Sequence, residues 1–175
     1  CQRDDPVSGA PLKIMVDANV WVDSFCADHA ESLAARAFIG QATEAGALLF
    51  FPVHIAKDVL YVVQHELKRS VLASGGALDE ASAVQLAMRR WCLSEHDRNA
   101  RPWRRCVGPL AGRQILSAPS RLRGQLVLAA CKRAQVDYLV TNDRKLLEHA
   151  DLAAKTPRQM MPILALAERG GAAIG

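Results

Sequence analysis

Three aspartates occupy positions from which a carboxylate could take part in chemistry. Asp17 ends the short apolar run of residues 13–16, Asp143 follows the run of residues 138–141, and Asp58 lies early in an amphipathic stretch. Aspartates in such places also cap helices or close turns. All three are nevertheless expected near one edge of a sheet, where their mutual repulsion would favour a bound Mg²⁺ or Mn²⁺. Such a metal can activate water and neutralise a phosphodiester in its transition state.

The elements that must position these acids alternate between strand and helix. Apolar runs predict buried strands at residues 13–16, 47–52 and 138–141. Helical periodicity predicts helices at residues 28–45, 55–69, 79–95 and 122–134, and a last helix that Thr156 and Pro157 begin. The alternation predicts an α/β fold, with a central parallel sheet, helices on both faces and ligands at the carboxyl ends of the strands.

The composition is that of one compact domain. The chain has 175 residues, of which 50% are hydrophobic and 23% charged, and its mean hydropathy is +0.03. No stretch approaches the roughly 18 unbroken apolar residues of a membrane helix, so no membrane association is expected. The five cysteines lack zinc spacing and a disulfide pattern, which favours thiols in a reducing cytoplasm. We expect a tail or expression remnant at residues 1–12, a domain at 13–168 and a flexible C-terminus at 169–175.

Positive charge is concentrated in residues 89–123. This basic segment has nine Arg against Glu95 and Asp97, a net charge of +7, which leaves −3 for the rest of a chain whose total is +4. An aromatic side chain within an arginine cluster could stack on bases while its neighbours contact phosphates. RNA is therefore the expected partner, with the contacts assigned to Arg101, Trp103, Arg104 and Arg105.

The sequence resembles PIN-domain nucleases, a family that includes many bacterial toxin ribonucleases. The resemblance covers residues 13 to about 166 and is carried by VDANVWVD, PVHIAKDVLYVV and, most distinctively, LVLAACKRAQVDYLVTNDRKLL. It implies a PIN-like three-layer sandwich and a Mg²⁺- or Mn²⁺-dependent endoribonuclease, with an antitoxin protein or a second copy of the chain as further partners. It also implies catalytic, metal-binding roles for Asp17, Asp58 and Asp143 and supporting polar roles for Asn19, Thr141 and Asn142.

The chain departs from the family pattern at one acid. In the family an acid begins the helix before the last block, eleven residues ahead of a glycine where this chain has Gln135. Counting back eleven residues gives Gly124, between Arg123 and Gln125. The resemblance therefore implies a site that lacks one core acid, with weak metal binding and little cleavage.

Two alternatives stay open at this point. The first is a PIN-like RNA- or protein-binding module that has lost catalysis, which Gly124 favours. The second is an α/β phosphohydrolase with an aspartyl nucleophile. That mechanism requires a second acid two residues after Asp17, where Asn19 stands, so this alternative ranks last.

Overall fold

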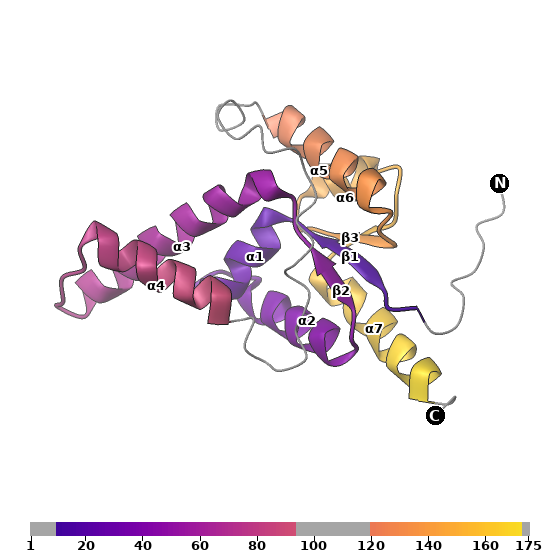
Figure 1. Cartoon of the computed structure of the whole chain (residues 1–175), viewed down its shortest axis with the longest axis horizontal. Coiled ribbons are helices and arrows are strands. Elements are labelled where there is room, and N and C mark those ends of the chain that lie inside the picture. Colours follow the sequence, from indigo (N-terminus) through magenta and orange to yellow (C-terminus); the bar gives the residue numbers. More distant parts are fainter. Residues whose placement is uncertain (1–9, 94–119, 173–175) are drawn as a thin grey trace.

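The computed structural model describes residues 10–93 and 120–172 (Figure 1). Those residues form four strands and seven helices, and no helix among them is long and apolar enough to cross a membrane. In chain order they are β1 (Lys13–Val16), α1 (Ala18–Phe25), α2 (Ser32–Glu44), β2 (Leu48–Phe50), α3 (Val53–Ala73), α4 (Glu80–Leu93), α5 (Ser120–Ala134), β3 (Tyr138–Val140), α6 (Arg144–His149), β4 (Ala154–Lys155) and α7 (Pro157–Ala172).

The four strands form one parallel sheet in the order β2-β1-β3-β4. Met15 of β1 pairs with Phe50 on one side and with Leu139 on the other. The chain crosses from β1 to β2 through α1 and α2, and then returns to place β3 on the opposite side of β1. The direction of winding therefore reverses between β1 and β3, and a crevice at such a point is where open α/β sheets bind ligands.

Alternating side chains of the sheet enter two separate hydrophobic clusters. Ile14 and Val16 join residues of α1, α2, α3 and α7 in one cluster, whereas Met15 and Leu139 join residues of α5 and α6 in the other. Successive strand residues point to opposite faces, so the two clusters lie on opposite sides of the sheet. The predicted α/β architecture, with a parallel sheet and helices on both faces, is confirmed.

Helices α3 and α4 form a hairpin that extends away from the sheet (Figure 1). Gln64 and Lys68 of α3 both bind Glu80 of α4. Asp79 precedes α4 and accepts hydrogen bonds from the hydroxyl of Ser82 at 2.5 Å and from its backbone N–H at 3.0 Å. These bonds, the hydroxyl first, hold the pKa of Asp79 below its ordinary value. The start predicted for this helix is therefore confirmed.

The predicted helix over residues 28–45 begins later than expected. The chain first makes a turn in which the His29 N–H donates to Cys26 O at 3.4 Å and the Ser32 N–H donates to His29 O at 3.0 Å. Glu31 then occupies the N-cap of α2 without a side-chain cap bond. The start predicted at Asp28, from its capping-box spacing with Glu31, is therefore wrong. The short elements α1, α6 and β4 were not predicted by periodicity, which needs longer stretches to stand out.

Candidate functional site

Asp17 sits at the junction of β1 and α1, where the sheet ends. Its backbone N–H donates to Val140 O at 3.0 Å, which extends the pairing of β1 with β3 by one residue. Its side chain caps α1 by accepting the Ala18 N–H at 2.7 Å. The residue is only 8% exposed. A buried carboxylate requires compensation, and here the helix terminus supplies part of it.

Thr141 connects the two strand ends. Its hydroxyl donates to Asp17 Oδ2 at 2.7 Å and accepts from Asn19 Nδ2 at 3.2 Å and from the Asp143 N–H at 3.0 Å. Thr141 has no exposed surface. Its hydroxyl therefore cannot bind solvent water, and these three bonds satisfy it instead. One buried hydroxyl therefore joins β1, α1 and the turn after β3.

Two asparagines extend this network. Asn19 Nδ2 also donates to Asp17 Oδ2 at 3.1 Å, and Asn19 Oδ1 accepts the backbone N–H of Asn142 at 3.2 Å. Asn142 Nδ2 in turn donates to Asp23 Oδ2 at 2.8 Å. Both of the amides predicted as supporting polar groups thus take part in a continuous set of hydrogen bonds around Asp17.

Asp143 lies at the outer edge of the network. It is exposed, and its Oδ1 accepts the Lys145 N–H at 2.8 Å as the N-cap of α6. Its backbone N–H reaches the Thr141 hydroxyl. The Thr141 hydroxyl thus links Asp143 to Asp17. The carboxylate of Asp143 itself lies outside the buried part of the network.

Asp58 belongs to a different element, the second turn of α3. It is half-buried and is followed by Val59, which packs fully buried in the cluster that includes α1. Helix α3 packs against α1. Asp58 thus lies on a helix neighbouring the one that Asp17 begins.

Gly124 lies on the face of α5 that packs against the sheet. It stands seven residues, or about two turns, before Cys131, which is buried in the same cluster as Leu146. A Cβ built on Gly124 would lie 3.2 Å from Leu146 Cδ2 and 3.9 Å from Leu146 Cγ. The immediate surroundings of this position are therefore apolar and closely packed.

Cys131 of α5 has a thiol whose pKa depends on its burial and on the charge of Asp17. Burial, and after it the negative charge of Asp17, raises the pKa of the Cys131 thiol from 9.0 to about 12. A thiol with that pKa stays protonated at neutral pH, so Cys131 is neither an activated nucleophile nor a ready metal ligand. Cys131 packs in the same cluster as Met15 and Leu139 of the sheet.

The oxygen atoms around Asp17 are of the type that binds a hard cation, but too few of them belong to free metal ligands. Carboxylate, hydroxyl and amide oxygens are the ligands that Mg²⁺ prefers. Asp17, however, already accepts three hydrogen bonds, from Ala18, Asn19 and Thr141. Within residues 10–93 and 120–172, no group of three or more His, Cys, Asp or Glu could hold a metal ion. Asp17 and its neighbours in this part of the chain therefore do not make a complete metal site.

Two members of the network were missed in the sequence. Asp23 accepts from Asn142, and its Oδ1 lies 2.8 Å from His29 Nδ1. Asp23 follows Asn19 by four residues, which places both on one side of α1, and this spacing was the available signal. His29 carried no such signal, because the turn that brings it back to Asp23 could not be read from periodicity.

The predicted RNA contacts Arg101, Trp103, Arg104 and Arg105 lie outside the residues that the structure describes. Comparisons of the chain with protein-family models, with curated proteins and with solved structures find no match.

Proposed function

We propose that this chain is a PIN-domain protein of the toxin-like, Mg²⁺- or Mn²⁺-dependent endoribonuclease class, which acts on RNA phosphodiesters at the carboxyl ends of β1 and β3. One observation carries the proposal: a buried carboxylate, Asp17, held by Thr141 and Asn19 where the winding of the sheet reverses. A buried acid with several dedicated partners at such a reversal of the sheet is a candidate for function. The resemblance to PIN nucleases supplies the reaction.

The charge distribution supports RNA as the substrate. The basic segment runs in the sequence from the end of α4 to the start of α5. Near that start, Gly124 lies beside Leu146 of α6, the helix that Asp143 caps at the end of the sheet. A local net charge of +7 attracts a phosphate backbone and releases its counterions on binding. RNA held by this segment would therefore be held near the end of the sheet.

Cleavage is expected to be weak in the chain as it stands. Gly124 occupies the place where the PIN pattern has an acid, and its surroundings are the apolar side chain of Leu146. A further carboxylate that gained a net 1.4 kcal/mol or so in metal binding would raise metal affinity about tenfold. Because the described acids do not form a group of three metal ligands, we assign no reaction step to a bound ion.

A second candidate function is a PIN-like RNA- or protein-binding module without catalysis. Two observations favour it: the acids within residues 10–93 and 120–172 form no group of three metal ligands, and Asp17 already accepts several hydrogen bonds. As with toxin-type PIN proteins, an antitoxin protein and a second copy of the chain are partners that either candidate allows.

The first test combines metal titration with cleavage of a structured RNA by the wild type, Gly124→Asp, Gly124→Ala and Asp17→Asn. Gly124→Asp is expected to raise Mn²⁺ affinity and cleavage at least tenfold. Gly124→Ala adds the same Cβ beside Leu146 without a carboxylate, so it should change neither. RNA binding in all four variants, with no cleavage in any, would select the binding module. Strong cleavage by the wild type that Asp17→Asn abolishes would show that another group completes the site.

A further inference from the structure

Asp23 uses both of its carboxylate oxygens inside the molecule. Oδ1 lies 2.8 Å from His29 Nδ1, and Oδ2 accepts from Asn142 Nδ2 at 2.8 Å. Its side chain is 16% exposed, whereas the imidazole of His29 is 35% exposed. A shielded carboxylate that holds two partners fixes both of them more firmly than an exposed one would.

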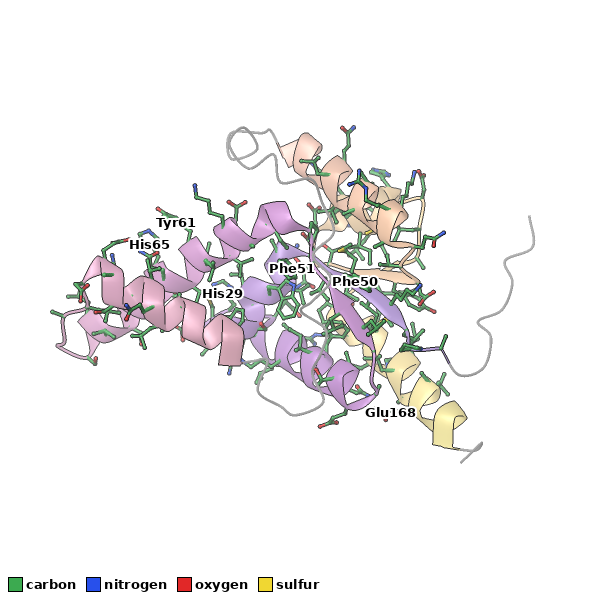
Figure 2. All side chains as sticks on the ribbon, in the orientation of Figure 1. His29, Phe50, Phe51, Tyr61, His65 and Glu168 are labelled. Atoms are coloured by element: carbon green, nitrogen blue, oxygen red, sulfur yellow. The ribbon has the colours of Figure 1, made fainter. Side chains whose placement is uncertain are left out.

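His29 stands in the turn between α1 and α2 and faces back toward α1 (labelled in Figure 2). A carboxylate can only accept, so the contact with Asp23 requires the proton of His29 on Nδ1. In metal sites, a carboxylate paired with an imidazole in this way fixes the ring and its tautomer. Here the imidazole of His29 also fixes the orientation of the Asp23 carboxylate.

Asn142 is bound to α1 at two points. Its backbone N–H donates to Asn19 Oδ1 at 3.2 Å and its Nδ2 donates to Asp23 Oδ2 at 2.8 Å. Asn19 and Asp23 are one helical turn apart. A single bond would let the turn after β3 rotate, whereas two bonds fix both its position and its orientation.

We propose that Asp23 and His29 are positioning residues, which hold the turn of residues 141–143 against α1 and so set Thr141 and Asp143 relative to Asp17. The hydrogen bonds run without interruption from the half-exposed imidazole through Asp23, Asn142 and Asn19 to the buried carboxylate. The inference rests on the proposed function only for the use of this turn, which is the edge assigned to RNA.

Amide hydrogen exchange tests the positioning role without RNA. Asp23→Asn keeps the shape of the side chain but replaces one acceptor oxygen with an amide donor, so Asn142 Nδ2 and the Nδ1–H of His29 can no longer both donate to it. It should speed the exchange of the Asn142 and Asp143 amides roughly fivefold, the effect of one lost hydrogen bond, while the Val140 amide of β3 keeps its rate. Asp28→Asn is the matched control, the same change on an exposed aspartate of the next turn, and should alter none of these rates.

Variants of His29 separate positioning from a general structural role. His29→Ala removes the donor to Asp23 and should speed the same two amides, whereas His29→Asn places an amide nitrogen where Nδ1 stood and should restore the wild-type rates. Unchanged rates at Asn142 and Asp143 in both Asp23→Asn and His29→Ala would overturn the proposal. So would equal acceleration at Val140, or no restoration by His29→Asn.

Cleavage and RNA affinity, measured in the Gly124→Asp background, form the second arm. Asp23→Asn and His29→Ala should lower the cleavage rate at saturating RNA while leaving RNA affinity within twofold, and His29→Asn should restore the rate. Affinity lost in parallel with rate would overturn the role as positioning. If Gly124→Asp neither binds nor cleaves RNA, the proposed function fails, and the exchange rates alone decide whether the pair positions the turn.

Discussion

A hydroxyl, rather than a charged group, is the centre of the candidate site. Thr141 donates once and accepts twice, and its three partners come from β1's end, from α1 and from its own turn. Valine has the same shape and suits a strand end equally well. The hydroxyl is therefore required by the network and not by the fold of the strand.

Replacing this hydroxyl should destabilise the protein. Thr141→Val leaves the buried carboxylate of Asp17, the side-chain amide of Asn19 and the backbone N–H of Asp143 each short of a partner, so the free energy of unfolding is expected to fall by about 1–3 kcal/mol. Thr43→Val is the matched control, since the Thr43 hydroxyl only donates to the Ile39 carbonyl within α2. Urea denaturation of the two variants measures the difference. Equal losses would show that the network around Asp17 contributes nothing special to stability.

Cys131 should make the protein sensitive to alkaline pH. Its folded pKa of about 12 lies above the ordinary value of 9.0, so between these values the unfolded chain releases a proton that the folded chain keeps. The unfolded state then binds fewer protons, and stability falls as pH rises above about 9. Cys131→Ala removes this contribution, so its stability should decline less steeply between pH 8.5 and 10.5. Parallel denaturation profiles for the two proteins would contradict the expected pKa.

At the scale of elements, the sequence predicts some helix starts correctly and others not. Thr156 and Pro157 predicted the start of α7, and the structure confirms it. The Thr156 hydroxyl accepts the Gln159 N–H at 3.2 Å, while Gln159 Oε1 accepts the Thr156 N–H at 3.0 Å. Asp28 and Glu31 have similar spacing but form no such cap, because the chain is still in a turn there. A capping pattern is thus visible in a few neighbouring residues, but whether those residues form a cap depends on where the helix packs.

The capping box of α7 should contribute measurably to stability. Thr156→Ala removes the acceptor for the Gln159 N–H, and such a loss costs about 1 kcal/mol. Helix α7 packs on α2 and its Met160 and Leu164 are fully buried, so fraying of its first turn affects the main cluster. Thr43→Ala, inside α2, is the control and should cost less, because alanine is favoured within helices. Thermal or urea unfolding of both variants provides the measurement.

The site itself was predicted in part. Strand ends and the α/β alternation indicated Asp17 and Asp143, because a parallel sheet brings the ends of its strands to one edge. The polar roles of Asn19 and Thr141 were implied only by the resemblance to PIN nucleases. The contact of Asp23 with Asn142 joins residues 119 positions apart, and no local pattern encodes such a pairing. The apolar packing of Gly124 against Leu146 likewise depends on how α5 meets α6.

At the scale of the whole molecule, the topology and the charge distribution act together. The return of the chain to β3 brings Thr141 to Asp17 across 124 positions of sequence. The basic segment lies within this long connection, from the end of α4 to the start of α5. Its net charge of +7 stands against −3 for the remainder, so the connection that completes the site also carries the positive charge.

If the chain binds RNA as proposed, this separation of charge should make the affinity depend on salt. Each phosphate neutralised by an arginine releases counterions, so the logarithm of affinity falls with the logarithm of salt concentration, with a slope of about −0.7 per contact for single strands. Replacing Arg101, Arg104 and Arg105 together with Ala should therefore weaken binding and flatten that slope by about 2. A triple replacement of Arg36, Arg144 and Arg158, which lie outside the basic segment and bind Ser24 O, Glu148 and Glu31, serves as the control. If both triple variants shift the slope equally, binding follows total charge, and the basic segment is not the RNA-binding surface.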